Sequence, residues 1–298
     1  MRVAVIGLGS MGMGAALNLV QAPGLEAAGC DPRESARAEF AAAGGIAVAR
    51  AADLPAGTEA VVVLVVNRAQ AEAALFGPEG AAPRLAPGAA IIVSATMAPT
   101  DARALAAQAE AAGFLYVDAP VSGGAVGARA GALTVMASGS AAAMAKARPV
   151  LDVVAKKVWY LGEASGMGAT MKVVHQLLAG VHIAVAAEAM ALGIKAGIEP
   201  RTLFEVVTGA AGNSWMFENR MPHVLDGDET PRSAVDIFVK DLGLVGDMAR
   251  DVAFPAPLAA MAHQLFVSAR AQGHGGKDDA FVIRAYQALT SIKLPTEG

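Results

Sequence analysis

The segment GLGSMG at residues 7–12, which directly follows the apolar run RVAVI, constrains the fold more than any other feature. It places Gly7, Gly9 and Gly12 in G-x-G-x-x-G spacing between a predicted strand and a predicted helix over residues 11–20. Glycines permit a tight turn and a close backbone approach, and the helix N-terminus then presents N–H groups to a pyrophosphate. The segment predicts a dinucleotide site, and this context disfavours the alternative of a glycine-rich turn without a ligand.

Asp31 sets the expected choice of dinucleotide. It follows Gly12 by 19 residues, at the end of the second predicted strand. A carboxylate there would hydrogen-bond ribose hydroxyls and repel a 2′-phosphate, so NAD is favoured over NADP, although Arg33 weakens the preference. From this half of the chain, the residues expected to contact the cofactor are Gly7, Leu8, Gly9, Ser10, Met11, Gly12, Asp31, Val66 and Asn67.

Apolar runs in the first half of the chain read as buried strands separated by helical segments. Three further strands are predicted over residues 60–66, 89–94 and 114–120. Continuous apolar strands are what a parallel sheet covered on both faces requires, so this half predicts a doubly wound α/β fold. After Leu161 the pattern changes to long helices without convincing strands. The predicted helices cover residues 168–196, 200–208, 233–251, 256–271 and 278–292.

Composition bounds the class of protein. The 298 residues suggest two domains, and the 17% charged fraction indicates a compact chain. The net charge of −4 makes nucleic acid and anionic membranes poor partners. Cys30 is the single cysteine, which excludes an internal disulfide and a thiolate zinc site and fits a reducing cytoplasm. No wider cluster of metal ligands is visible, so chemistry without a metal is predicted.

The apolar stretch over residues 173–194 is interrupted by His175, Gln176, His182 and Glu188. The interruptions favour a buried helix over a membrane span. An apolar helical domain also suggests self-association.

Two loops that follow predicted strands are candidate binding elements. Thr96 would lie in the crevice at the carboxyl ends of the strands, where ligands bind in such sheets, or would serve as a cap before the next helix. Ser122, Gly123 and Gly124 form a small loop rich in backbone N–H donors, which suits a substrate carboxylate. An ordinary glycine turn is the alternative for this loop.

Lys172 enters near the start of the apolar helix, after GMGAT. Desolvation and the positive end of the helix both lower the pKa of a lysine in this setting. A lysine with a pKa nearer neutrality is a good general base for an alcohol and a good acid for the reverse reduction. The alternative is a lysine whose ammonium group reaches solvent.

The motifs GLGSMG, DAPVSGGAVGARAG, GMGATMK and VKDLGL, in this order, resemble the β-hydroxyacid dehydrogenase family. The resemblance implies a Rossmann-type, doubly wound, mostly parallel sheet over residues 1–163. It also implies an all-α C-terminal domain over 164–298 of the 6-phosphogluconate dehydrogenase-like type, entered by a long helix over about 166–196. It further implies that Thr96 contacts the cofactor, that residues 122–124 bind substrate, that Lys172 is catalytic and that Lys240 lies beside the nicotinamide.

His175 and Gln176 depart from the two asparagines that the family usually has at these positions. The segments HQLLAGVHIA, AAGNSWMFENRM and SAVDIFVKDLGLV resemble the L-threonate dehydrogenase branch, whose members oxidise a four-carbon sugar acid at C2 with NAD. His175, Gln176 and Asn213 could supply the extra hydrogen bonds that such a substrate needs. Residues 212–220 would then line or close the pocket, or form a helix junction anchored by two aromatic side chains.

The sequence therefore predicts NAD-dependent oxidation of a small hydroxy acid, L-threonate above others, with Lys172 as general acid/base. Oxidation of 3-hydroxyisobutyrate and reduction of tartronate semialdehyde are the enzymatic alternatives. A module that binds NAD as a sensor, without turnover, is the alternative from another class. The resemblance implies a homodimer or homotetramer.

Overall fold

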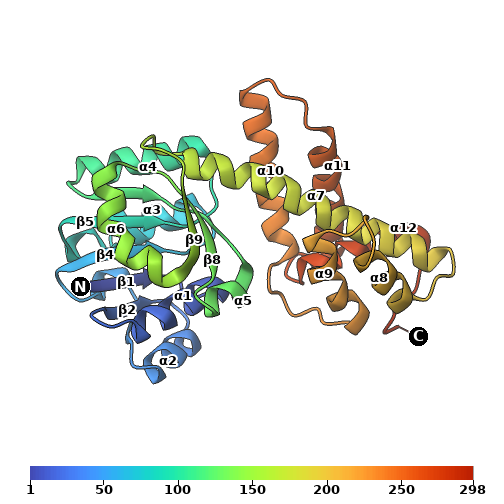
Figure 1. Ribbon diagram of the computed structural model, residues 1–298, viewed down its shortest axis with the longest axis horizontal. Coiled ribbons are helices and arrows are strands. Elements are labelled where there is room, and N and C mark those ends of the chain that lie inside the picture. The colour runs from blue at the N-terminus through green and yellow to red at the C-terminus, as the bar shows by residue number, and fades with distance from the viewer. Residues whose placement is uncertain (298) are drawn as a thin grey trace. The chain divides into compact units, whose positions relative to one another are not determined.

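The computed structural model describes residues 1–297, and the chain divides into two compact units, Met1–Lys172 and the remainder from Val173. Figure 1 shows the main sheet of the first unit, with β1, β2, β4 and β5 labelled. This sheet has six strands in the order β3-β2-β1-β4-β5-β6, and every neighbouring pair is parallel. Its strands are β1 (Arg2–Ile6), β2 (Glu26–Cys30), β3 (Ile46–Val48), β4 (Thr58–Val63), β5 (Leu85–Val93) and β6 (Leu115–Asp118). The predicted doubly wound sheet is confirmed, and β1 and β4 meet where the strand order reverses.

Helices cover both faces of this sheet. They are α1 (Ser10–Gln21), α2 (Glu34–Ala42), α3 (Arg68–Phe76), α4 (Pro99–Ala111), α5 (Gly124–Arg129) and α6 (Ala141–Val154), with short 3₁₀ turns η1 (Ala51–Asp53) and η2 (Ala82–Arg84). Val3 and Val5 of β1 pack in one apolar cluster with side chains of α1, α2 and α6. Ala4 and Ile6 pack in the opposite cluster with side chains of α3 and α4. Burial on both faces explains why the strands are continuously apolar.

A second, smaller sheet of β7 (Val121–Ser122), β8 (Leu133–Ala137) and β9 (Ala155–Tyr160) was not predicted as such. β7 and β8 are antiparallel, whereas β8 and β9 are parallel. The predicted strand over residues 60–66 was too long at its end, because β4 stops at Val63. Val66 and Asn67 therefore belong to the connection between β4 and α3.

The remaining helices are α7 (Met167–Lys195), which begins in the first unit, and α8 (Pro200–Thr208), α9 (Trp215–Asp226), α10 (Val235–Asp251), α11 (Pro257–Ala269) and α12 (Arg284–Thr290), with a π turn η3 (Arg270–His274) and a 3₁₀ turn η4 (Asp279–Ile283). The all-helical character of this half is confirmed. The single helix predicted over residues 278–292 is instead η4 followed by α12, and α9 was not predicted as a helix. Ile183 and Met190 of α7 are fully buried, in one cluster with Phe238 and Phe266, whose ring centroids lie 5.3 Å apart.

Among the described residues, α7 is the one helix long and apolar enough to cross a membrane by length and composition. Half of its most apolar stretch is buried inside the protein.

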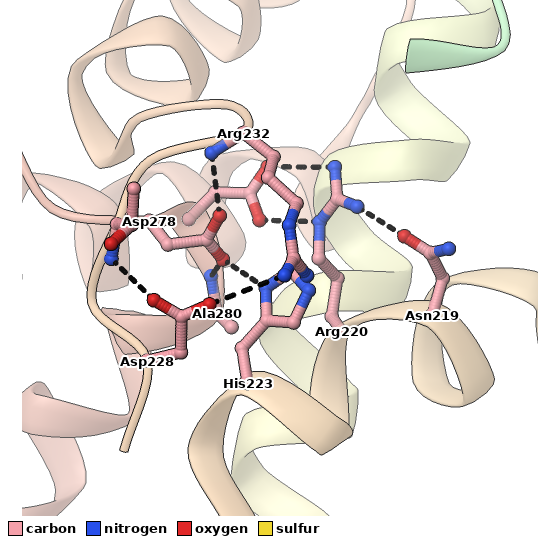
Figure 2. Close-up of polar contacts among 9 residues, drawn as sticks. Asn219, Arg220, His223, Asp228, Arg232, Asp278 and Ala280 are labelled. Atoms are coloured by element: carbon pink, nitrogen blue, oxygen red, sulfur yellow. Dashed lines mark hydrogen bonds and ion pairs between the residues drawn. The ribbon is translucent and has the colours of Figure 1, made fainter. Parts of the chain in front are cut away.

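A buried polar network joins α9 to the start of η4 (Figure 2). His223 Nδ1 lies 2.8 Å from Asp278 Oδ1, and the backbone N–H of Arg232 donates to the other oxygen of Asp278. Arg220 Nε lies 2.6 Å from an oxygen of Asp279. Both aspartates are fully buried, so each partner compensates a carboxylate that would otherwise be costly to remove from water.

Candidate active site

The glycine loop between β1 and α1 combines two glycines required by packing with one that faces open space. Gly7 has a φ of +93°, and a Cβ atom there would lie 2.6 Å from the carbonyl oxygen of Leu64. A Cβ atom at Gly12 would lie 1.7 Å from the carbonyl oxygen of Gly7. At Gly9 no atom lies within 4 Å of the added Cβ. Gly7 and Gly12 therefore shape the turn, while Gly9 leaves room for a ligand above the helix N-terminus.

Asp31, at the end of β2, is tied to this loop. Its carboxylate accepts hydrogen bonds from the backbone N–H of Leu8 and from Nε of Arg33, each at 2.9 Å. Burial raises the pKa of Asp31, but the hydrogen bonds from Arg33 and Leu8 outweigh it and hold the pKa below its ordinary value. The carboxylate is thus ionised at neutral pH and available as an acceptor for ribose hydroxyls.

A cavity of about 220 Å³ adjoins the same loop in the first unit. It is lined by Leu8, Gly9, Ser10, Met13, Arg33, Ser35, Ala36, Glu39 and Arg129. The guanidinium of Arg129 lies 3.0 Å from the carboxylate of Glu39. The helix N-terminus, the open space at Gly9 and the carboxylate of Asp31 together fit an adenine dinucleotide.

Three further predicted cofactor contacts follow β4 and β5. Val66 and Asn67 lie between β4 and α3, and Thr96 lies half-buried between β5 and α4. Asn67 Oδ1 accepts from the N–H of Gln70, so this side chain caps α3. The N–H of Val66 donates to the side chain of Gln70 at 3.0 Å. These residues lie at the carboxyl edge of the sheet, where ligands bind in such folds.

The predicted substrate loop follows β6. Ser122 is half-buried at the end of β7, and Gly123 and Gly124 have φ values of +129° and +62°. Only glycine adopts such a pair readily, so the sequence here is fixed by backbone geometry. The loop turns its main chain sharply from β7 into α5, which is compatible with backbone N–H groups binding a carboxylate.

Lys172 lies in the second turn of α7 and is 7% exposed. The first turn of the helix is anchored by Asp118, a residue that was not predicted to matter. Asp118 Oδ2 accepts from the N–H of Ala169 at 2.7 Å, and Ser138 Oγ accepts from the N–H of Gly168 at 3.1 Å. Burial raises the pKa of Asp118 to about 6, against the lowering effect of these hydrogen bonds. The signal was its place in DAPVSGG, at the end of a strand.

His175, Gln176 and Lys240 are brought together in the second unit through Asp241, which was not predicted. His175 Nδ1 lies 3.0 Å from Gln176 Oε1, and Gln176 Nε2 donates to Asp241. Lys240 Nζ lies 2.9 Å from the other oxygen of Asp241. Gln176 and Asp241 are buried, so the amide of Gln176 links α7 to α10.

Asn213 lies elsewhere in the second unit, between α8 and α9. Its side-chain amide donates to the carbonyl oxygen of Thr208 and to Glu218, each at 3.3 Å. With His182 it lines a cavity of about 240 Å³ that His175 and Gln176 do not line. His182 follows His175 by seven residues, which is about 10 Å along a helix axis. From Trp215 onward the segment 212–220 is helical and belongs to α9.

Two family profiles match consecutive parts of the chain. Residues 2–162 match a family described as the NAD-binding domain of 6-phosphogluconate dehydrogenase. Residues 166–286 match one described as NAD-binding of NADP-dependent 3-hydroxyisobutyrate dehydrogenase. Within residues 1–297, no group of three or more His, Cys, Asp or Glu side chains could hold a metal ion.

Relatives match over nearly the whole length. L-threonate dehydrogenase from Cupriavidus necator is 52% identical, over 98% of this chain and 97% of that protein. L-threonate dehydrogenase from Haemophilus influenzae is 53% identical, over 99% of this chain and 97% of that protein. A crystal structure from Salmonella typhimurium, described as 3-hydroxyisobutyrate dehydrogenase, is 53% identical with a TM-score of 0.92, covering 95% of this chain and 99% of its own.

The two family profiles, the relatives and the structure assign both halves of the chain to the same kind of protein. The NAD-binding profile covers the sheet that carries the glycine loop and Asp31. The second profile covers most of the helices from α7 onward. The chain therefore belongs to the β-hydroxyacid dehydrogenase family and is an NAD-dependent hydroxyacid dehydrogenase.

Proposed function

We propose that the enzyme oxidises L-threonate at C2 to the 2-oxo acid with NAD. The observation that carries the proposal is the identity of more than half of its residues with proteins named L-threonate dehydrogenase, over nearly their full lengths. His175 and Gln176 support it, because a polyhydroxylated acid needs more hydrogen-bonding partners than a methyl-bearing one.

In the proposed reaction Lys172 accepts the proton of the C2 hydroxyl. NAD held by the glycine loop and Asp31 would supply the acceptor for the hydride of the same carbon, so one C–H and one O–H bond would break as the carbonyl forms. The backbone N–H groups of residues 122–124 hold the substrate carboxylate. The burial of Lys172 supports its role, because a general base at a fixed place near the start of α7 can be held in reach of the substrate hydroxyl.

The remaining predicted contacts divide between orientation and recognition. His175 is the side chain proposed to meet a substrate hydroxyl, with Gln176 orienting it through their 3.0 Å contact. Lys240, paired with Asp241, is proposed to support the nicotinamide end. Val66, Asn67 and Thr96 are proposed to contact the cofactor. Asn213 keeps a proposed substrate role only if the segment 212–220 moves toward α7 residues 175–176 on binding.

A panel of acids tests the substrate. Reduction of NAD should be fastest with L-threonate and slower with 3-hydroxyisobutyrate and glycerate. The formation of reduced nicotinamide measures each rate. The description of the Salmonella relative favours 3-hydroxyisobutyrate as the second candidate. Turnover of 3-hydroxyisobutyrate without turnover of threonate would replace the substrate proposal with that candidate. NAD binding without reduction by any hydroxy acid would favour the sensor function.

Replacement of Lys172 tests the chemistry. Lys172→Ala should lower kcat by about 10² or more, as loss of a positioned general acid–base group does. NAD affinity should change little, because the glycine loop and Asp31 are untouched. Near-normal kcat in this variant would remove Lys172 from the mechanism.

We infer further that the enzyme works in the cytoplasm as a homodimer or homotetramer. Val174, Leu178, Val185 and Leu192 of α7 are each at least 45% exposed, at spacings of four and seven residues along one side of the helix. Such a run of exposed apolar side chains is unusual on a monomer. Light scattering on the eluted protein would give the mass, and a monomer across micromolar concentrations would contradict the inference.

A further inference from the structure

The carboxylate of Asp118 is buried at the end of β6, where the proposed reaction gives it no task. It is 2% exposed. Its hydrogen-bonding partners include the N–H of Ala169 at 2.7 Å and the hydroxyl of Ser138 at 3.4 Å. Main-chain hydrogen bonds of 2.8 and 2.9 Å also join Asp118 to Ser138, which lies just beyond β8. A carboxylate in such a place costs free energy that an apolar residue would avoid.

The first turn of α7 rests directly on these two strand ends. A Cβ atom at Gly168 would lie 2.5 Å from the carbonyl oxygen of Met136 and 2.7 Å from that of Asp118. No side chain fits there, so the helix backbone itself is the contacting surface. Two of the N–H groups that the helix leaves unpaired at its start, those of Gly168 and Ala169, are satisfied by Ser138 and Asp118.

The anchor that Asp118 and Ser138 provide for the first turn of α7 involves residues close in sequence to the proposed catalytic Lys172 and to the proposed substrate loop 122–124. Lys172 follows Ala169 by three residues, about one helical turn. Ser122 follows Asp118 by four residues, through β7. A shift of the helix start by a fraction of an ångström would carry the lysine with it, and misplacement on the order of 1 Å can cost about 10² in rate.

We propose that Asp118 is a positioning residue for Lys172. Its carboxylate, assisted by Ser138, fixes the first turn of α7 against the strand end that leads into the substrate loop. The proposal rests on the proposed role of Lys172. Ionised Asp118 is the form that matters, because only a carboxylate presents acceptors alone to the N–H groups of a helix start.

The test is Asp118→Asn, assayed with NAD and L-threonate or whichever acid of the panel is turned over. The amide keeps the shape but presents an NH₂ group to backbone N–H donors. We expect kcat to fall by about 10- to 100-fold, as for a displaced catalytic group, with NAD affinity and KM within about twofold. The thermal midpoint should not fall together with kcat, because the substitution also removes a buried charge.

Thr170→Val is the matched control. Thr170 lies in the same turn of α7, but its hydroxyl donates to Gly166 O at 2.8 Å and not to Asp118. It should keep kcat near wild type. Ser138→Ala removes one anchor and leaves the other, so kcat should fall by a smaller factor than in Asp118→Asn.

The outcomes separate this proposal from the proposed function. If Lys172→Ala is impaired while Asp118→Asn keeps wild-type kcat, the positioning role is wrong and the role of Lys172 stands. If Lys172→Ala turns over normally, the proposed role of Lys172 is wrong, and the positioning role of Asp118 is wrong with it. Parallel loss of kcat, NAD affinity and thermal stability in Asp118→Asn would make the residue merely structural. Should that variant not fold, Ser138→Ala decides, and unchanged kcat there would overturn the proposal.

Discussion

At the scale of single residues, we expect Asp31 and Arg33 to set the preference for NAD over NADP jointly. The guanidinium neutralises part of the charge that would repel a 2′-phosphate, with contacts of 2.9 and 3.0 Å to the carboxylate. Any ribose hydroxyl that binds Asp31 must share it with Arg33 and with the N–H of Leu8. Preference for NAD is therefore expected to be marked but not absolute, and to depend on the charge of Asp31.

We predict that Asp31→Asn lowers kcat/KM for NAD by about 10- to 100-fold, the worth of a hydrogen bond to a charged group. The value for NADP should fall less or rise, because the repulsion of its 2′-phosphate disappears. Steady-state kinetics with both cofactors measures the ratio. Arg33→Ala is the paired variant and should move the ratio the other way, toward NAD. An unchanged ratio in both would remove this pair from cofactor choice.

Gln176 shows which residue roles the sequence could predict. Its position on the face of α7 near Lys172 followed from helical spacing. Its partner Asp241 is 65 residues away, and no local pattern pairs the two. Asn67 is the simpler case, because its cap of Gln70 spans three residues, the spacing at which an asparagine caps a helix. Local partners could be predicted, whereas partners supplied by tertiary packing could not.

We predict that Gln176→Leu lowers the free energy of unfolding by about 1–3 kcal/mol, because Asp241 loses a buried hydrogen bond. The KM for the acid should also rise, since His175 loses the amide that orients it. Urea unfolding and steady-state kinetics provide the two readouts. A loss of stability without any change in KM would confine Gln176 to linking α7 and α10.

At the scale of elements, the glycine loop contains one glycine, Gly9, expected to matter only for NAD binding, and another, Gly12, expected to matter for stability as well. Gly9→Ala adds a methyl group with no protein atom within 4 Å, so the thermal midpoint should hold while NAD affinity falls about tenfold or more. Gly12→Ala places its methyl group 1.7 Å from Gly7 O and should reduce both stability and binding. Calorimetry and NAD titration distinguish the two variants. Normal NAD affinity in Gly9→Ala would mean that the cofactor does not approach this glycine.

The ion pair between Arg220 of α9 and Asp279 of η4 joins two helical elements where both side chains are largely shielded from water. Arg220→Ala should cost about 3–5 kcal/mol of unfolding free energy, because it leaves a buried carboxylate uncompensated. Arg201→Ala breaks an exposed pair with Asp226 at 2.9 Å and should cost less than about 1 kcal/mol. Denaturant titrations of the two variants test the contrast, and equal losses would contradict it.

Elements with strong periodicity were predictable, and those whose sequence carries opposing signals were not. α8 covers the predicted range because Pro200 and the cap at Glu199 mark its start. α9 escaped prediction because Pro222 lies inside it and the glycine-rich segment before it reads as loop. β9 is half exposed, so its sequence AKKVWY lacks the apolar run that marked the strands of the main sheet.

At the scale of the whole molecule, ionisation of Asp118 has opposite effects on stability and activity. It lowers the stability of the folded protein, whereas the proposed positioning of Lys172 requires the ionised form. Its pKa in the folded protein is raised by burial to about 6, above the ordinary 3.8. The folded state therefore holds more protons than the unfolded state between about pH 4 and 6, and this contribution to stability falls as pH rises through that window. The ionised carboxylate of Asp118 is less favourable in the folded protein, where it is buried, than in the unfolded chain, where water solvates it.

We predict that the stability of Asp118→Asn relative to wild type improves by about 2 kcal/mol between pH 4.5 and 7.5, because only the wild type loses stability as its buried carboxyl ionises. Unfolding free energies of both proteins at several pH values measure the difference. Other titrating groups cancel in the comparison. A difference independent of pH would mean that Asp118 titrates normally in the folded protein.

The anchor of α7 also bears on how relatives of this enzyme can diverge. Asp118 and Ser138 bind main-chain N–H groups, which every residue except proline supplies, whereas Gly166 and Gly168 are restricted by contact there. A recombinant that joins the first 163 residues to the helical half of another family member would retain both acceptors of this junction, and it would need glycine at the positions of Gly166 and Gly168. His175 and Gln176, which are proposed to recognise the substrate, would then be exchanged as a block, so new substrate ranges would arise by recombination while the attachment of the helix stays constant.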